Sequence, residues 1–244
     1  MEDKIVWSDV DDYLIDKLIT IDSELEDILR ANEEADLPAI DVSPTQGKLL
    51  YLITKLRSPK NILEIGTLGG YSSLWFAKAL NKGAKIYTLE ANSKYANVAR
   101  KNIEQTPFSD QVEIIEGKAL ETLPILAEKE VPFNLIFIDA DKENNPAYLN
   151  WALKLANKGA VIIADNIVRN GEIIEEHSTD PRIQGVRSFF DLLENHPQVE
   201  STAIQTVGQK GYDGFVLAID RKKLSDDHSV FFSTGIVGIP FIAF

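Results

Sequence analysis

Two short groups of polar side chains follow hydrophobic stretches that have the character of buried strands. Asp139 comes after residues 134–138, and the pair Asp165 and Asn166 comes after residues 160–164. The interval between the groups is long enough for one helix to cross over and return the second strand parallel to the first, about 4.8 Å away. Two carboxylates and an amide oxygen on one rim would suit a hard divalent cation, Mg²⁺ first, with Mn²⁺ or Ca²⁺ as alternatives. The simpler alternative is that both carboxylates only cap the helices that follow.

Lys142 lies three residues beyond Asp139 and could reach the same rim. A nearby cation and partial burial would both favour the neutral amine, which could then accept a proton from a substrate. Lysine side chains are usually exposed, so a solvated surface lysine is the competing interpretation.

A glycine-containing segment, residues 64–72 (Glu-Ile-Gly-Thr-Leu-Gly-Gly-Tyr-Ser), joins a strand-like run to a helical one. Glycine there lets the backbone turn tightly and lets a ligand approach the main chain. Leu68 occupies the second glycine position of a Gly-x-Gly-x-x-Gly pattern that begins at Gly66, so the segment is not the dinucleotide fingerprint. A plain strand-to-helix turn is the alternative.

Glu90 closes the next predicted strand, where a carboxylate can accept hydrogen bonds from both hydroxyls of a ribose. Alone it is weak evidence, because solvated carboxylates are common at strand ends. Together with the glycine turn, it favours a cofactor that contains adenosine.

The elements that would carry these residues alternate between strands and helices from residue 61 onward. Strands are predicted at 62–65, 85–89, 112–115, 133–138 and 160–164, and helices at 71–80, 93–105, 119–129, 146–156 and 181–194. Two further strands, 199–205 and 213–219, have no helix between them, which suits an antiparallel hairpin. The pattern predicts an α/β fold: a Rossmann-like, doubly wound, seven-stranded mixed sheet with a parallel core and helices on both faces.

The N-terminal part is predicted to be helical. Apolar residues repeat every three to four positions over 13–35, which predicts one amphipathic helix or two short ones. A further helix begins after Ser43, with Ser43 as its N-cap and Pro44 in its first position.

Composition and charge exclude several classes of function. The 244 residues are 44% hydrophobic and 26% charged, as in ordinary globular proteins. A net charge of −13 argues against a protein that holds nucleic acid or anionic lipid by neutralising phosphates. The absence of cysteine excludes disulfides, thiolate zinc sites and a cysteine nucleophile. The first twelve residues lack the features of a signal peptide, so we expect a cytoplasmic protein.

The end of the chain differs from the rest. Residues 230–244 carry no charged side chain, are shorter than a membrane span of about 20 residues and contain Gly235, Gly238 and Pro240. Such an apolar segment could pack as an added strand or across a subunit interface. We expect one domain over residues 1–222, with N-terminal helical additions at 1–58, followed by an apolar tail at 223–244, and a homodimer without a membrane span.

Three segments together resemble a known family. Residues 62–73, 133–142 and 162–166 are similar to the cation-dependent S-adenosylmethionine O-methyltransferases, the group that contains the caffeoyl-CoA and catechol O-methyltransferases. The resemblance covers about residues 43–219, and residues 205–215 are similar to bacterial members. The order and spacing of several motifs agree, which is more specific than any one motif.

The resemblance implies a role for each matching position. Cofactor-binding positions are Val42 through its main chain, Gln46, Glu64, Gly66, Ser72, Glu90 for the ribose, Ala119 for the adenine, Asp139 and Tyr148. Metal ligands are Asp139, Asp165 and Asn166, and Lys142 matches the proposed general base. Two positions depart from the pattern, because Gln46 stands where plant relatives have a carboxylate and Arg169 where many relatives have tryptophan.

These features predict an S-adenosylmethionine-dependent O-methyltransferase that acts on a phenolic, catechol-like small molecule. A catechol could offer two oxygens to the cation, which would lower the pKa of the coordinated hydroxyl from its usual value of about 10. Two alternatives remain from the sequence. One is a Rossmann-type NAD(P)-binding oxidoreductase, and the other is a non-catalytic interaction protein on a methyltransferase scaffold.

Overall fold

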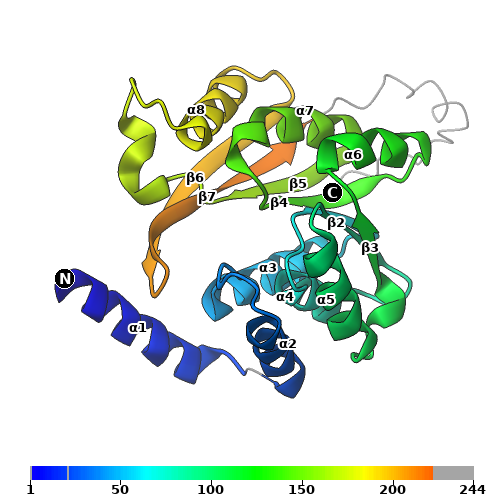
Figure 1. Cartoon of the computed structure of the whole chain (residues 1–244). Helices are drawn as coiled ribbons and strands as arrows, with labels where there is room; N and C mark the ends of the chain where they lie inside the picture. The colour runs from blue at the N-terminus through cyan, green and yellow to red at the C-terminus, as the bar shows by residue number, and fades with distance from the viewer. Residues whose placement is uncertain (1, 21, 222–244) are drawn as a thin grey trace, which may run out of the picture.

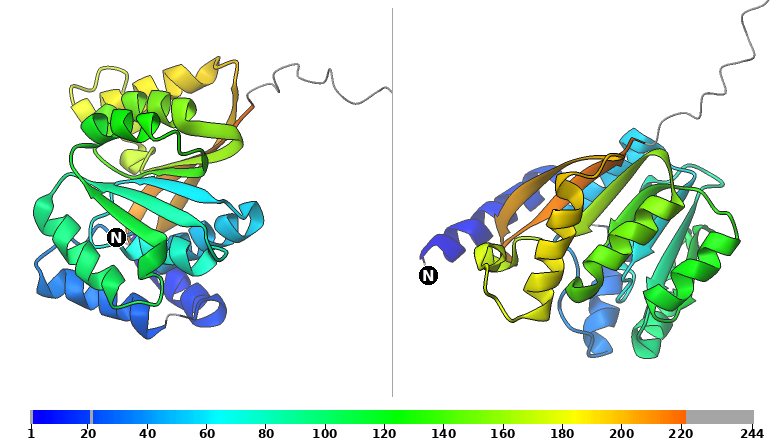
Figure 2. Two further views of the ribbon diagram at one scale, coloured as in Figure 1. Left: turned by 90° about the vertical axis from the view of Figure 1, so that its right-hand side faces the viewer. Right: turned by 90° about the horizontal axis from the view of Figure 1, so that it is seen from above.

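A computed structural model describes residues 2–20 and 22–221. Its centre is a seven-stranded sheet in the order β3-β2-β1-β4-β5-β7-β6, covered by helices on both faces (Figures 1 and 2). Strands β1 to β5 are parallel, whereas β7 is antiparallel to both of its neighbours, β5 and β6. The predicted fold class is therefore confirmed. The predicted apolar tail at 223–244 lies outside the described residues.

The strands are β1 (Asn61–Ile65), β2 (Lys85–Glu90), β3 (Val112–Glu116), β4 (Phe133–Ile138), β5 (Ala156–Asp165), β6 (Val199–Gly208) and β7 (Gly211–Asp220). The helices are α1 (Glu2–Leu18), α2 (Ser23–Glu34), α3 (Pro44–Arg57), α4 (Tyr71–Ala79), α5 (Ser93–Glu104), α6 (Ala119–Glu128), α7 (Asn145–Leu155) and α8 (Pro181–Glu194). Three short 3₁₀ helices are η1 (Ser109–Gln111), η2 (Lys142–Asn144) and η3 (Arg169–Ile174). Each predicted strand and helix from residue 61 onward has its counterpart here.

The N-terminal helices differ in extent from the prediction. The segment 13–35 forms parts of two helices, and α1 begins near Glu2 rather than at Tyr13. Asp22 separates the two helices because its side chain accepts a hydrogen bond from Leu25 N and caps α2. The helix predicted after Ser43 is confirmed, since the Ser43 side chain accepts from Gln46 N and Pro44 opens α3.

Strands β5, β6 and β7 are each longer than predicted. β5 starts at Ala156, directly after α7, and pairs there with Phe133 of β4 across an irregular register. β6 and β7 continue to the pair Gly208 and Gly211, so the hairpin turn is formed by Gln209 and Lys210 rather than by a seven-residue connection.

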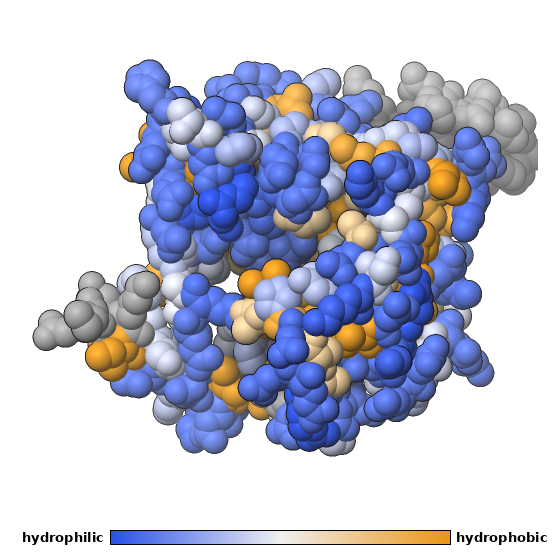
Figure 3. Space-filling model, in the orientation of Figure 1, coloured by the Kyte–Doolittle hydropathy of each residue, from blue (hydrophilic) through white to orange (hydrophobic). Residues whose placement is uncertain are grey.

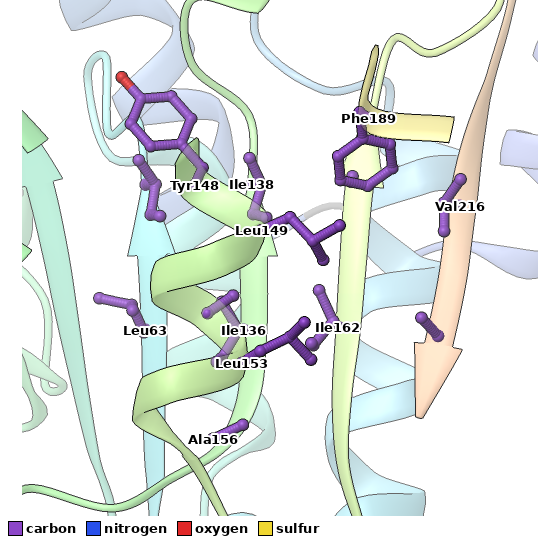
Figure 4. Packing of buried hydrophobic residues seen from close by; sticks show 14 of the residues in the cluster. Leu63, Ile136, Ile138, Tyr148, Leu149, Leu153, Ala156, Ile162, Phe189 and Val216 are labelled. Carbon is purple, nitrogen blue, oxygen red and sulfur yellow. The ribbon is translucent and has the colours of Figure 1, made fainter. Parts of the chain in front are cut away.

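The core consists of two layers, one on each face of the sheet. On one face, Leu63, Ile136 and Ile162 lie in register on neighbouring strands and pack against Leu149 of α7 and Phe189 of α8 (Figure 4). The opposite layer contains buried side chains of α2, α3, α4 and α5, among them Leu25, Leu50, Phe76 and Ile103. The two layers cover the faces of the sheet but not the carboxyl ends of its strands, and these ends form the rim of a site.

The strand register determines which side chains meet at that rim. Ile65 of β1 pairs with Leu89 of β2 and with Ile138 of β4, and Ile138 pairs with Ala164 of β5. The residues that follow these positions therefore emerge side by side, as expected for the carboxyl ends of parallel strands where the strand order reverses. No helix among the described residues is long and apolar enough to cross a membrane.

Candidate active site

The rim opens into a cavity of about 600 Å³ that we call the cofactor cavity. Most of the side chains singled out from the sequence line it: Val42, Gly66, Ser72, Glu90, Ala119, Asp139, Lys142, Tyr148 and Asn166. Most come from the ends of β1, β2, β4 and β5 and from the segments that follow them, whereas Ala119 opens α6 after β3 and Val42 lies just before α3. The structure thus brings together residues that are separated by more than one hundred positions in the chain.

Gly66 allows the turn after β1 to approach the end of β4. Its φ angle is +98°, and a Cβ atom at this position would lie only 2.1 Å from the main-chain oxygen of Asp139. Gly66 N donates to Leu89 O of β2 at 3.0 Å. No larger residue fits this position without moving backbone, so the turn requires glycine.

Glu64 is fully buried and lies behind the cavity wall. Its carboxylate accepts hydrogen bonds from Ser72 Oγ at 2.6 Å and from Ser73 Oγ. Burial raises the pKa of Glu64 to about 7, although the serine hydroxyls oppose the shift. Glu64 therefore fixes the first turn of α4, and Ser72 is the member of this group that lines the cavity.

Glu90 holds the glycine turn from the neighbouring strand. Its Oε2 atom accepts from Thr67 N at 3.3 Å and from Leu68 N at 2.9 Å, and its Oε1 atom accepts from Asn92 N at 2.8 Å. The carboxylate lines the cavity while it makes these contacts. Sequence analysis predicted a ligand-facing carboxylate but missed that it also fastens the turn.

Lys142 and Asp139 form a close pair at the end of β4. Lys142 Nζ lies 2.9 Å from Asp139 Oδ1, and the lysine side chain is 7% exposed. η2 carries Lys142, and Gly185 of α8 packs directly on its main chain, where a Cβ atom would lie 2.2 Å from Lys142 O. The lysine is therefore held in the cavity wall, in contrast to the solvated surface lysine of the alternative interpretation.

Asp165 and Asn166 lie at the end of β5, beside this pair. Burial and the charge of Asp139 raise the pKa of Asp165 to about 7, and Lys142 opposes the shift. Asn166 has a left-handed φ of +54° and donates its main-chain N–H to Asp165 Oδ1 at 2.8 Å. No group of three or more His, Cys, Asp or Glu side chains forms a metal cluster in the described part of the chain. The predicted set has two carboxylates, and an amide oxygen would have to complete it, a chemistry that fits a hard cation.

A second cavity of about 280 Å³, which we call the acceptor pocket, adjoins the first. Asp165, Asn166 and Gln46 line it, together with the start of α3, Asp11 of α1 and the β6–β7 hairpin. Gln46 was predicted from the resemblance as a cofactor residue, but the structure places it in this smaller pocket, hydrogen-bonded to Asp165. Ile40, Asp41, Val42 and Asn166 line both cavities and form their shared wall.

Three carboxylates near the site were not singled out from the sequence. Asp141 accepts a hydrogen bond from Tyr148 Oη at 2.5 Å, and burial raises the pKa of this tyrosine. Asp213 of β7 accepts from the N–H groups of Val168 and Arg169 at 2.9 and 3.0 Å. Asp41 lies in the shared wall. Only Asp141 had a local signal, its place in the Asp-Ala-Asp-Lys run that ends at Lys142.

Known proteins share this fold and much of this sequence. A family model described as O-methyltransferase matches residues 19–221. The catechol O-methyltransferase from Niastella koreensis is 46% identical to the chain, over 88% of this chain and 97% of its own length. The catechol O-methyltransferase from Mycobacterium tuberculosis is also 46% identical, over 87% of this chain and 96% of its own length.

Solved structures agree with these relatives. The O-methyltransferase from Bacillus cereus in complex with SAH has a TM-score of 0.88 at 53% identity, covering 89% of this chain and 99% of its own. The O-methyltransferase TomG from Streptomyces achromogenes in complex with SAM has a TM-score of 0.87 at 41% identity, covering 91% and 100%. Together with the geometry above, these matches show that the chain belongs to the O-methyltransferase family and is an S-adenosylmethionine-dependent enzyme.

Proposed function

We propose that the enzyme transfers a methyl group to a hydroxyl of a phenolic, catechol-like small molecule and that a divalent cation binds this acceptor. The observation that carries the proposal is the position of Asp139, Asp165 and Asn166 where the cofactor cavity meets the acceptor pocket. Burial and the neighbouring charge of Asp139 raise the pKa of Asp165, and a bound cation would offset this repulsion between the two carboxylates. The names of the catechol O-methyltransferase relatives support the same acceptor class.

The chain's own residues have separate tasks in this proposal. When bound, the cation would supply the charge that favours the ionised hydroxyl of the acceptor and would orient it for in-line attack. The charge of the cation would also favour the neutral amine of Lys142, which is held in the cavity wall beside Asp139 and in that form accepts the proton that leaves this hydroxyl. Mg²⁺ is the first candidate because the donors are all oxygen atoms, with Mn²⁺ or Ca²⁺ as alternatives.

The cofactor would lie along the cofactor cavity, with its sulfonium methyl toward the shared wall. Glu90 would bind the ribose and Ala119 the adenine. The methionine part would contact Gly66, Ser72, Asp139, Tyr148 and the Val42 main chain, with Glu64 behind Ser72 and Gln46 on the acceptor side. Each assignment is supported by the position of the residue in or beside the cavity lining.

Calorimetric titration with S-adenosylhomocysteine, followed by methyl transfer to catechol with and without EDTA, tests the proposal. We expect cofactor binding, turnover that EDTA abolishes and recovery on adding Mg²⁺. Asp165→Asn should lose turnover at ordinary Mg²⁺ concentrations, whereas Asp191→Asn, a change on the exposed surface of α8, should not. Turnover that EDTA leaves intact would exclude the cation from the reaction, and no turnover of any catechol would exclude the acceptor class.

A further inference from the structure

A buried chain of hydrogen bonds runs from the glycine turn of the cofactor cavity to the wall shared with the acceptor pocket. Asn102 Nδ2 of α5 donates to Gly69 O at 2.9 Å and to Asn32 Oδ1 of α2 at 3.1 Å. Asn32 Nδ2 donates in turn to Asp41 Oδ1 at 3.0 Å. Asn32 is 3% exposed and Asn102 is 7% exposed, so water cannot readily replace these contacts.

At the glycine-turn end of this row of hydrogen bonds, Asn32 and Gly69 are closely packed. A Cβ atom at Gly69 would lie 1.7 Å from Asn32 Oδ1, so the amide of α2 packs directly on the turn. A shift of the turn would therefore push against Asn32 or stretch its bond to Asn102. Interiors packed this closely transmit small displacements instead of absorbing them.

Asp41, at the other end of this row of hydrogen bonds, belongs to the proposed catalytic site. Asp41 lines both cavities, and its main-chain oxygen accepts a hydrogen bond from Lys210 Nζ at the tip of the β6–β7 hairpin. The segment that contains Asp41 and Val42 is thus held from one side by α2 and from the other by the hairpin. It has no regular secondary structure of its own, so these side-chain contacts determine its place.

We propose that Asn32 is a positioning residue for methyl transfer, which holds the Asp41 wall of the acceptor pocket in register with the glycine turn of the cofactor cavity. Methyl transfer needs donor and acceptor atoms aligned at about 3 Å, and a misplacement of about 1 Å can cost two orders of magnitude in rate. Asn32 itself lines neither cavity, so it acts through its contacts with Asp41 and Gly69. This inference rests on the proposed function only in its kinetic test, which uses catechol as the acceptor.

The donor and acceptor pattern of the pair allows a swap experiment. Asn32→Asp keeps an acceptor for Asn102 but removes the donor to Asp41, and it places a second carboxylate against the partly buried one of Asp41. Asp41→Asn keeps an oxygen that can accept from Asn32, so it should lose less than Asn32→Asp. The double variant N32D/D41N exchanges donor and acceptor and remakes the hydrogen bond.

Kinetics with catechol and Mg²⁺ give the first readout. We expect N32D to lower kcat/KM for catechol about tenfold, mainly through kcat because the reacting atoms lose alignment, and the double variant to recover to within about threefold of the wild type. The control is Asn97→Asp, an exposed change on α5, which should leave both parameters unchanged. A double variant as impaired as N32D would overturn the proposal, and so would D41N with a loss equal to that of N32D, because Asp41 would then act through its charge.

Hydrogen exchange gives a second readout that needs no acceptor. The wild type, N32D, D41N and N32D/D41N are compared after saturation with S-adenosylhomocysteine. We expect the backbone amides of residues 39–42 to exchange faster in N32D than in the wild type and to regain protection in N32D/D41N. Equal protection in all four proteins would overturn the positioning role. If the wild type methylates no catechol, the proposed acceptor is wrong, and hydrogen exchange alone then decides this inference.

Discussion

Lys142 is the general base in the proposed reaction. It is buried, it lies 2.9 Å from Asp139, and α8 packs on its main chain. Lys142→Met keeps much of the volume but removes the amine. We expect kcat for catechol to fall by about two to four orders of magnitude, the usual contribution of a general base, while cofactor affinity changes little.

A matched control separates this role from a general effect of losing a lysine. Lys154→Met removes an exposed lysine of α7 that stacks on Trp151, and it should leave kcat within a factor of about two. Steady-state kinetics and cofactor titration of both variants provide the comparison. A Lys142→Met enzyme with normal kcat would show that another group takes the proton.

Glu64 gives a prediction about pH and stability. The pKa of Glu64 is about 7 in the folded protein, whereas the ordinary value of 4.5 applies to the unfolded chain. Between pH 4.5 and 7, the unfolded chain has therefore released a proton that the folded protein retains. The free energy of unfolding should therefore fall as pH rises from 4.5 to 7, by up to roughly 3 kcal/mol from this residue. Glu64→Gln cannot ionise and should show a flatter pH profile in urea unfolding of the cofactor-free protein.

The comparison between variants isolates Glu64 from other groups. Asp165, whose pKa is also about 7, contributes to the same pH range, but it does so equally in the wild type and in Glu64→Gln. Glu200→Gln changes an exposed carboxylate of β6 and should leave the wild-type profile intact. An unchanged profile in Glu64→Gln would mean that Glu64 is already ionised at pH 5.

Residue types at strand ends could be predicted from the sequence, but the contacts that hold them could not. The hydrophobic run before Asp139 and the glycine turn after β1 are local patterns, and they gave the rim correctly. The bond from Asn32 to Asp41 depends on how α2 packs on α5, and no local pattern encodes that packing. The structure places Lys142 in the cavity lining, and its role as the general base, which comes from the resemblance, stays a prediction.

Parallel pairing explains why the ends of β1, β2, β4 and β5 meet at one edge. This pairing was predictable because alternating strands and helices imply parallel neighbours. The lengths of α1 and of the hairpin were not predictable in the same way. α1 is amphipathic only weakly, and Gly208 lies so close to Asp11 of α1 that a Cβ atom would be 2.3 Å from Asp11 Oδ2. Gln209 N donates to the same carboxylate at 2.8 Å, so a contact across the whole chain helps to fix the turn.

The loop after β5 depends on one carboxylate of β7. Asp213 Oδ1 accepts from Val168 N, Arg169 N and Gly214 N at 2.9, 3.0 and 3.0 Å. Asp213→Ala leaves these donors without their acceptor, so we expect a loss of about 1–3 kcal/mol in the free energy of unfolding and a higher KM for the acceptor, because the loop adjoins Asn166. Asp213→Asn retains an oxygen acceptor and should lose less than half as much. Equal losses in both variants, measured by urea unfolding, would show that the charge matters rather than the hydrogen bonds.

At the scale of the whole chain, family membership overturns both alternatives drawn from the sequence, the NAD(P)-binding oxidoreductase and the non-catalytic interaction protein. The mixed sheet alone could not distinguish the oxidoreductase, because both classes use the carboxyl ends of parallel strands. The distinction came from the glycine turn, which lacks the dinucleotide pattern, and from relatives that match nearly their full length.

The face of the molecule shown in Figure 3 is mostly hydrophilic. On α1, several apolar side chains are exposed. Ile5, Val6, Val10, Tyr13 and Leu18 are each at least half exposed. Burying these side chains stabilises association by about 25 cal/mol per Å² of apolar surface, which is the reason to expect a homodimer. The same helix touches the hairpin that lines the acceptor pocket, so association would also steady that wall.

We therefore predict that the enzyme is a homodimer and that a charge on α1 separates it. Val6→Glu combined with Val10→Glu should shift the mass measured by light scattering toward that of one 27.2 kDa chain, because two buried carboxylates at an interface cost more than the apolar contacts they replace. The acceptor KM should rise in this variant, since only the Asp11 contact within the same chain would then hold the hairpin wall. The control is Leu56→Glu, which places the same charge on an exposed apolar residue of α3 and should leave the wild-type mass. A wild-type protein that already has the mass of one chain at micromolar concentration would contradict the prediction, and an unchanged dimer in the α1 variant would place the interface elsewhere.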